Sequence, residues 1–238
     1  TKRVCSVPVE QVFPALFQSD QGTCTGCDAP CAHDGSGPAR GIASGMSWEE
    51  AICQALLDWC NYLTVEEVKN TRRAYAQVDL SSASLMPEGT YLYCLLRETV
   101  GQQLCIYDVT GSLGVPTFAT CFGEQVLAYA THYDEAHALG IGFERALQRY
   151  QAEHCQQLEC VGVPAPALPS FLRASRLSVP RYGLPTAWPA RQEWLLQRLR
   201  LNGFRVLVIP LDHDPVLARI LPFIVQILLS SRALKKGE

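Results

Sequence analysis

The sequence has no surplus of positive charge and no long apolar segment. Its 20 lysine and arginine residues are outnumbered by 23 aspartates and glutamates, and the net charge is −3. Nucleic-acid-binding proteins generally carry a basic surplus or stripe, so we expect no nucleic-acid partner. The most apolar run, residues 216–229, contains Arg219 and Pro222 and is shorter than the roughly 20 residues that a membrane-spanning helix needs. We therefore expect no membrane partner and assign this run to buried strand.

A secretory signal and a fixed-period repeat are also lacking. Thr1, Lys2 and Arg3 lead into valine and proline rather than a long apolar stretch, so we expect no export signal. The 11 cysteines would indicate a disulfide framework only in a small exported domain. Six cysteines lie inside apolar periodic segments, where a free thiol packs as a small hydrophobe: Cys53, Cys60, Cys94, Cys105, Cys121 and Cys155. We therefore predict a cytoplasmic protein with reduced thiols.

The composition of the sequence is typical of a folded protein. Its apolar residues repeat at helical spacing in some segments and alternate as in strands in others. Hydrophobic residues make up 48% and charged residues 18% of the 238 positions. Helices are expected at residues 48–63, 90–100, 134–150 and 190–201, and strands at 103–109, 115–122, 126–131, 205–211 and 220–229. The run 91–96 also fits a strand. Four further segments are assigned as entry strands (4–18), a Cys/Gly-rich loop (19–40), a polar broken stretch (64–89) and a Pro-rich loop (161–189). This mixture predicts an α/β or α+β sandwich of helices on a mixed β-sheet.

One loop and the helix after it carry candidate chemistry. Ser47 followed by Glu50 forms a capping box at the helix start. Gly41 and Gly45 in the preceding loop would let a ligand approach the backbone, and a helix N-terminus favours an anion. A polar stripe runs along the helix at positions Glu50, Gln54, Asp58 and Asn61. Oxygen ligands beside an anion-accepting loop suit a Mg²⁺–phosphate site, but by itself the stripe is more typical of a solvated helix face, with Glu50 closing its capping box.

Residues 41–58 resemble the loop and helix that open the second half of YcaO-type domains. The pattern there is roughly Asn-Gly-x-Ala-x-Gly, then Glu-Glu-Ala, then Leu-Leu-Glu-x-x-Glu-Arg-Asp. Residues 107–110, 114–118, Ala146-Leu147 and 201–211 with Pro222-Phe223 follow in the family's order. The resemblance implies that residues 1–238 form the C-terminal portion of a YcaO-like domain. The family's first-half Gly-Lys-Gly loop and glutamate helix have no counterpart in the sequence.

The resemblance implies a chemistry, a set of partners and a set of ligands. Azoline-forming members of the family use ATP and Mg²⁺ to activate a peptide amide that a Cys, Ser or Thr side chain has attacked. The implied partners are a precursor peptide and a leader-peptide-binding subunit or fused domain, in a homo- or hetero-oligomer. The implied cofactor-binding residues are Gly41, Gly45, Glu50, Asp58 and Asn61. The resemblance assigns no catalytic residue.

Several positions depart from the family pattern. Glu50 matches a family acidic position, and Asp58 keeps the charge of a glutamate on a shorter side chain. Asn61 replaces a glutamate, and Tyr62 replaces an arginine that would meet phosphate. The remaining departures are Arg40 in place of Asn, Gln148-Arg149 in place of Thr-Glu, and a C-terminus without the proline-rich tail. We therefore favour a degenerate component that acts as scaffold or peptide-binding partner, with an active ATP-dependent cyclodehydratase as the alternative.

A cysteine cluster offers a different class of function. Cys24, Cys27, Cys31 and His33 could hold a structural Zn²⁺, with Cys5 as a more distant ligand. Such a site would define a zinc-stabilised binding module without a nucleotide site, although free clustered thiols fit the spacing too. Nothing marks one cysteine as an activated nucleophile. We assign His132 and His137 as a loop histidine and a helix-surface histidine.

Overall fold

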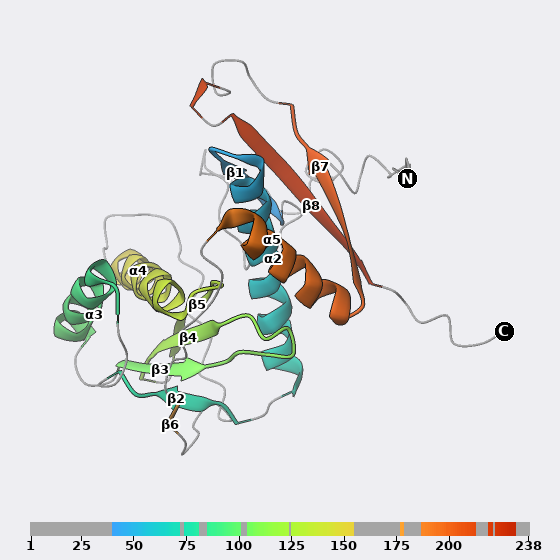
Figure 1. Ribbon diagram of the computed structural model, residues 1–238. Helices are drawn as coiled ribbons and strands as arrows, with labels where there is room; N and C mark the ends of the chain where they lie inside the picture. The colour runs from blue at the N-terminus through green and yellow to red at the C-terminus, as the bar shows by residue number, and fades with distance from the viewer. Residues whose placement is uncertain are drawn as a thin grey trace, which may run out of the picture.

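A long helix lies between two β-sheets in the computed structural model (Figure 1). The structure describes residues 40–71, 74–80, 85–100, 104–123, 125–154, 177–178, 187–212, 219–220 and 222–231. In chain order the elements are β1 (Ile42–Gly45), α2 (Trp48–Thr71), β2 (Ala76–Val78), α3 (Pro87–Val100), β3 (Leu104–Asp108), β4 (Thr117–Phe122), β5 (Gln125–Thr131), α4 (Glu135–His154), β6 (Leu177–Ser178), α5 (Trp188–Leu201), β7 (Phe204–Pro210) and β8 (Phe223–Ser231).

The smaller sheet has three antiparallel strands in the order β1-β8-β7. The first half of α2 and the whole of α5 pack on one face of this sheet (Figure 1). Leu56 of α2, Leu195 of α5 and Ile227 of β8 meet there without solvent exposure. Burial of such side chains is the main favourable contribution to folding, so this cluster fixes α2 against the sheet.

The larger sheet has five strands in the order β5-β4-β3-β2-β6. Its pairs are antiparallel except β2–β6, which is parallel, so the sheet is mixed as predicted. Successive β4 residues point to opposite faces. Phe118 packs with Phe143 under α3 and α4, whereas Ala119 packs with Val68 near the end of α2. Helix α2 therefore contributes to the cluster on the smaller sheet and to the cluster around Ala119 on the larger sheet.

The main expectations for regular structure are confirmed. The predicted helices and strands are present with ends shifted by a few residues, and the run 91–96 is helical. The description of residues 64–89 as polar and broken was wrong, because α2 continues to Thr71 and β2 follows. Thr64 and Val68 are fully buried against the larger sheet, and this tertiary burial extends the helix beyond its strongly amphipathic part.

Among the described residues, no helix has the length and apolar character needed to cross a membrane. The predicted entry strands, most of the Cys/Gly-rich loop and most of the Pro-rich loop lie outside the described residues.

Candidate functional site

The segment that precedes α2 was predicted as a loop, but its residues Ile42–Gly45 form β1, paired with β8. The turn at Gly41, before β1, is held by α2 itself. Gly41 has a positive φ of 72° and its N–H donates to Asp58 Oδ2 at 2.8 Å. A Cβ atom on Gly41 would lie 2.1 Å from Trp59 Nε1, which donates to the Ile227 carbonyl at 2.7 Å. Glycine is therefore required here by the approach of Trp59 and by the left-handed backbone.

The predicted capping box is present at the start of α2. The N–H of Glu50 donates to Ser47 Oγ at 3.1 Å, and the N–H of Met46 donates to Glu50 Oε2 at 2.8 Å. Gly45, just before this cap, is buried, and a Cβ there would lie 2.7 Å from the Ala51 nitrogen. The carboxylate of Glu50 thus satisfies the N–H of Met46, the residue before the N-cap, rather than the N-cap N–H itself.

Asn61 faces the larger sheet. Its Oδ1 accepts a hydrogen bond from Thr131 Oγ1 at 3.0 Å, and Thr131 Oγ1 lies 2.8 Å from Thr117 Oγ1. Both threonines are buried, so the three side chains form a polar network between α2 and the ends of β4 and β5. Buried polar groups need such partners, because an unmade hydrogen bond in the interior is costly.

The residue after Asn61 is Tyr62, and the guanidinium of Arg40 lies over its ring. The guanidinium carbon of Arg40 lies 3.7 Å from the centroid of the Tyr62 ring, within the range of a cation–π contact. Among the described residues, the buried Nη2 of Arg40 has no hydrogen-bond partner. Arg40 thus places a guanidinium beside Tyr62, the position at which the resemblance to YcaO-type domains implies an arginine.

The polar stripe does not bring its carboxylates together. Glu50 and Asp58 are eight residues apart, which is about 12 Å along the axis of an α-helix, and Asn61 lies one further turn away. Within the part of the chain that the structure describes, no group of three His, Cys, Asp or Glu ligand atoms gathers on this stripe. Each of the three side chains also has a partner within the fold. The described residues therefore do not by themselves fit Mg²⁺ and ATP, and their role in cofactor binding stays a prediction.

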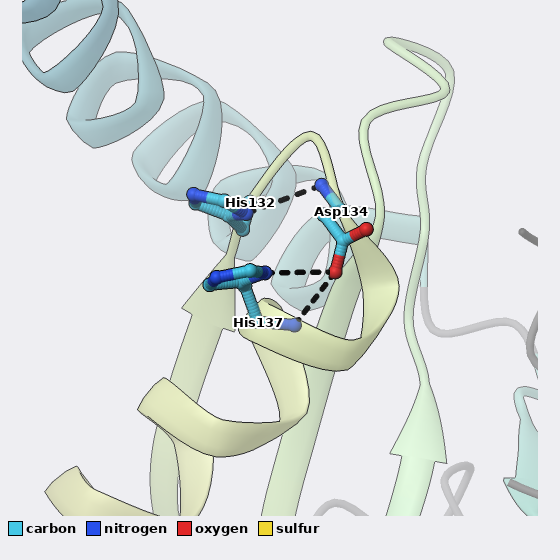
Figure 2. Close-up of side chains that lie close together, drawn as sticks. All are labelled: His132, Asp134 and His137. Atoms are coloured by element: carbon cyan, nitrogen blue, oxygen red, sulfur yellow. Dashed lines mark hydrogen bonds and ion pairs between the residues drawn. The ribbon is translucent and has the colours of Figure 1, made fainter. Parts of the chain in front are cut away.

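A different cluster gathers where β5 leads into α4, as Figure 2 shows. One ligand atom from each of His132, Asp134 and His137 lies within 4.8 Å of the others. The Asp134 N–H donates to His132 Nδ1 at 3.2 Å, and Asp134 Oδ1 lies 3.0 Å from His137 Nδ1. Asp134 Oδ1 also accepts the N–H of His137 at 2.9 Å, which caps α4 as predicted.

The two histidines differ in their surroundings. The His132 residue is only 6% exposed, and burial, with a smaller contribution from His137, lowers its pKa to about 4. His137 is a helix-surface residue with 52% of its side chain exposed. Although burial acts to raise the pKa of Asp134, the hydrogen bonds from His137 hold it below its usual range. His132 is thus a loop histidine as predicted, but a buried one.

Sequence reasoning missed this cluster as a unit. The signal was present in the spacing His-x-Asp-x-x-His, with Asp134 at a helix N-cap and His137 three residues later on the same face. The position of His132 depends on where β5 ends, which the spacing alone does not fix.

The described cysteines are free thiols, of which Cys53, Cys60 and Cys121 are buried and Cys105 is half-buried. Cys94 is exposed, so the prediction that it packs as a small hydrophobe was wrong. Burial raises the pKa of Cys53 to about 11 and the pKa values of Cys60 and Cys121 to about 12. A thiol is nucleophilic as its thiolate, so these three side chains are packing residues. The predicted zinc ligands Cys24, Cys27, Cys31 and His33 lie outside the described residues, and that site remains a prediction.

Comparison with solved structures identifies the fold. A heterocyclase in complex with substrate and cofactor matches with a TM-score of 0.64 and 18% identity, over 80% of this chain and 28% of that chain. The YcaO protein of Methanopyrus kandleri, bound with AMPPCP and Mg²⁺, matches with a TM-score of 0.60 and 16% identity, over 80% and 54% of the two chains. The E. coli microcin synthetase McbBCD complex with pro-MccB17 bound matches with a TM-score of 0.52 and 13% identity, over 81% and 54%.

Comparison of the sequence alone finds no such match. No protein-family model and no curated protein matches the sequence. The chain spans between about a quarter and about half of the length of these structural neighbours. The fold is nevertheless similar over about four fifths of this chain. The chain therefore has the fold of a partial YcaO-type domain.

Proposed function

We propose that this chain is the YcaO-like component of a thiazole- or oxazole-forming peptide-modification system, in which it acts as scaffold or peptide-binding partner without turning over ATP. This proposal rests on one observation: the candidate ligand side chains already form hydrogen bonds with other groups of the protein. Glu50 closes a capping box, Asp58 binds the Gly41 N–H, and Asn61 binds Thr131. Side chains held by such bonds and spread along a helix do not supply the converging charges that phosphoryl transfer needs.

The partners we propose follow the structural neighbours. One neighbour is a heterocyclase with substrate and cofactor, and another is a synthetase complex with its pro-peptide bound. By analogy, this chain would meet a precursor peptide and a leader-peptide-binding subunit or fused domain. The free thiols among the described cysteines support a reducing, cytoplasmic setting.

One observation favours an active ATP-dependent cyclodehydratase as a second candidate. Arg40 carries a buried Nη2 without a hydrogen-bond partner among the described residues, and its guanidinium covers Tyr62. An unsatisfied buried donor is costly unless a ligand completes it. A phosphate oxygen would be a suitable acceptor, so Arg40 could replace the arginine that is missing at position 62.

Calorimetric titration of the full chain with Mg²⁺–AMPPCP separates the two candidates. We expect no saturable heat up to about 1 mM nucleotide, the upper end of the usual KM range. Binding at micromolar concentrations would refute the proposal. In that case Arg40→Met, which keeps the side-chain length without its charge, should weaken binding at least about tenfold if Arg40 is the phosphate ligand. Zinc bound through Cys24, Cys27, Cys31 and His33, without nucleotide affinity, would instead favour the zinc-stabilised binding module.

A further inference from the structure

The cluster of His132, Asp134 and His137 at the β5–α4 junction has no part in the proposed function. Packed elements of the fold hold its residues in place. His132 directly follows β5, Asp134 is the N-cap of α4, and His137 lies in the first turn of α4. Helix α4 packs against β4 and β5, so both ends of the cluster are anchored to the larger sheet. Sites placed on packed elements hold their ligands more firmly than sites on open loops.

The three side chains offer the ligands that divalent transition metals prefer. Two imidazole nitrogens and one carboxylate oxygen form a common ligand set for Zn²⁺ and related ions. The Nδ1 edges of both rings face Asp134, as Figure 2 shows. Asp134 Oδ1 and His137 Nδ1 are 3.0 Å apart, and two ligands bonded to one ion at about 2.0–2.1 Å lie about 3.0–3.4 Å apart.

The existing hydrogen bonds hold the three side chains close together, so that an ion can bind between them. Asp134 is fixed by capping the backbone of His137 through Oδ1, the same oxygen that lies 3.0 Å from His137 Nδ1. The bond from the Asp134 N–H to His132 Nδ1 is 3.2 Å, at the upper end of the ordinary range, and an ion bound at Nδ1 would replace it. Three protein ligands leave a fourth position open to water or a ligand.

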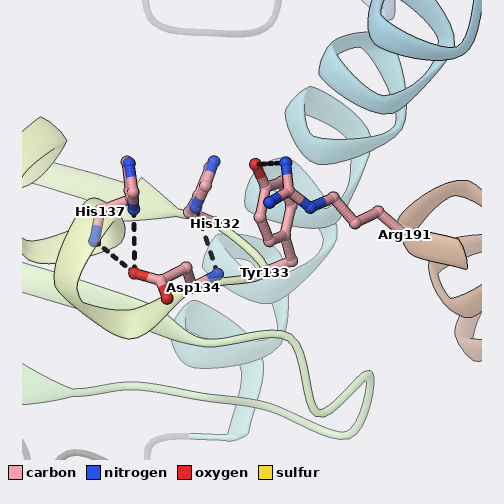
Figure 3. Close-up of polar contacts among 5 residues, drawn as sticks. All are labelled: His132, Tyr133, Asp134, His137 and Arg191. Atoms are coloured by element: carbon pink, nitrogen blue, oxygen red, sulfur yellow. Dashed lines mark hydrogen bonds and ion pairs between the residues drawn. The ribbon is translucent and has the colours of Figure 1, made fainter. Parts of the chain in front are cut away.

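The neighbouring aromatic residues hold the buried ring in place. The centroid of the Tyr133 ring lies 3.8 Å from that of His132, and the guanidinium of Arg191 lies 4.1 Å from the Tyr133 centroid on the other side (Figure 3). Arg191 also donates a hydrogen bond to the Tyr133 hydroxyl. The positive charge of Arg191 acts on His132 and opposes a cation there, and the three ligands would have to outweigh this effect. Such surrounding contacts orient metal-binding histidines.

We propose that His132, Asp134 and His137 form a binding site for a divalent transition metal ion, distinct from the predicted Cys24–His33 cluster and independent of nucleotide binding. The ion would be held between the β5 end and the first turn of α4. The site would lie at the surface, because His137 is exposed while His132 forms its inner wall.

The site is tested by treating the whole chain and three matched variants with chelator and then titrating each of them with zinc. His137→Ala removes an exposed ligand. Asp134→Asn keeps a good helix N-cap but offers a neutral amide oxygen, a weaker ligand. Glu144→Ala changes an exposed residue of the same helix outside the cluster.

We expect His137→Ala to lose one bound equivalent of Zn²⁺ and Asp134→Asn to bind that equivalent at least about tenfold more weakly. Glu144→Ala should bind like the unmodified chain. The cysteine cluster cannot produce this difference between variants, because its ligands are unchanged in all of them. Equal stoichiometry and affinity in all four proteins would overturn the proposal. Circular dichroism of each variant checks that the fold is kept, and Asp134→Asn preserves the test if His137→Ala unfolds.

Discussion

Replacing Gly41 by alanine should destabilise the protein far more than the same change at Gly203. Both glycines have a positive φ, 72° and 82°, so both variants have the cost of a left-handed alanine, about 1 kcal/mol. At Gly203 the added Cβ meets nothing within 4 Å. At Gly41 it would lie 2.1 Å from Trp59 Nε1 and 2.7 Å from the Ile227 carbonyl oxygen. The alanine must therefore displace the indole.

The expected magnitude follows from what that displacement removes. The Trp59 N–H bond to the Ile227 carbonyl is lost, at about 1 kcal/mol or more for an unsatisfied donor. The forced shift of packed groups adds about 1–2 kcal/mol, as overpacking usually does. Gly41→Ala should thus lower the free energy of unfolding by about 3–4 kcal/mol in total, against about 1 kcal/mol for Gly203→Ala.

Urea denaturation followed by circular dichroism measures both variants. A double-mutant cycle with Trp59→Phe sharpens the result, because the smaller ring removes part of the clash. Gly41→Ala should then cost less in the Trp59→Phe background than alone. If Gly41→Ala and Gly203→Ala were equally destabilising, the close approach of Trp59 would not be the reason for the glycine, and the interpretation of this turn would be refuted.

Two further predictions concern the buried polar network and the thiols. Thr131→Val should lower the free energy of unfolding by about 1–3 kcal/mol, because it leaves Asn61 without its hydrogen-bond partner. Chemical denaturation measures this loss, with Thr131→Ser, which keeps the hydroxyl, as the control. Equal losses of stability in the two variants would contradict the prediction. Iodoacetamide followed by peptide mass spectrometry should modify exposed Cys94 in the folded protein and leave buried Cys60 unmodified until denaturant is added, because burial raises the pKa of Cys60 to about 12. Similar rates at the two cysteines in the folded chain would count against the assignment of Cys60 to the core.

Local sequence patterns were sufficient for the elements whose signals are short-range. The Ser47–Glu50 capping box predicted the start of α2, and the bonds that close it span three and four residues. Asp134 likewise predicted the start of α4. The end of α2 could not be predicted, because residues 64–71 are helical through burial of Thr64 and Val68 against a sheet that the local sequence does not contain.

The sequence by itself determined that Glu50, Asp58 and Asn61 share a helix face and that a YcaO-like order of segments is present. Only the tertiary structure decided what those side chains contact. Asn61 meets Thr131 across 70 positions, and Trp59 meets Ile227 across 168, so neither partner follows from helical spacing. The same holds for the cluster of His132, Asp134 and His137, which requires β5 to end at Thr131 before α4 begins. Periodicity fixes which face a side chain occupies, whereas its partner depends on which distant strand packs against that face.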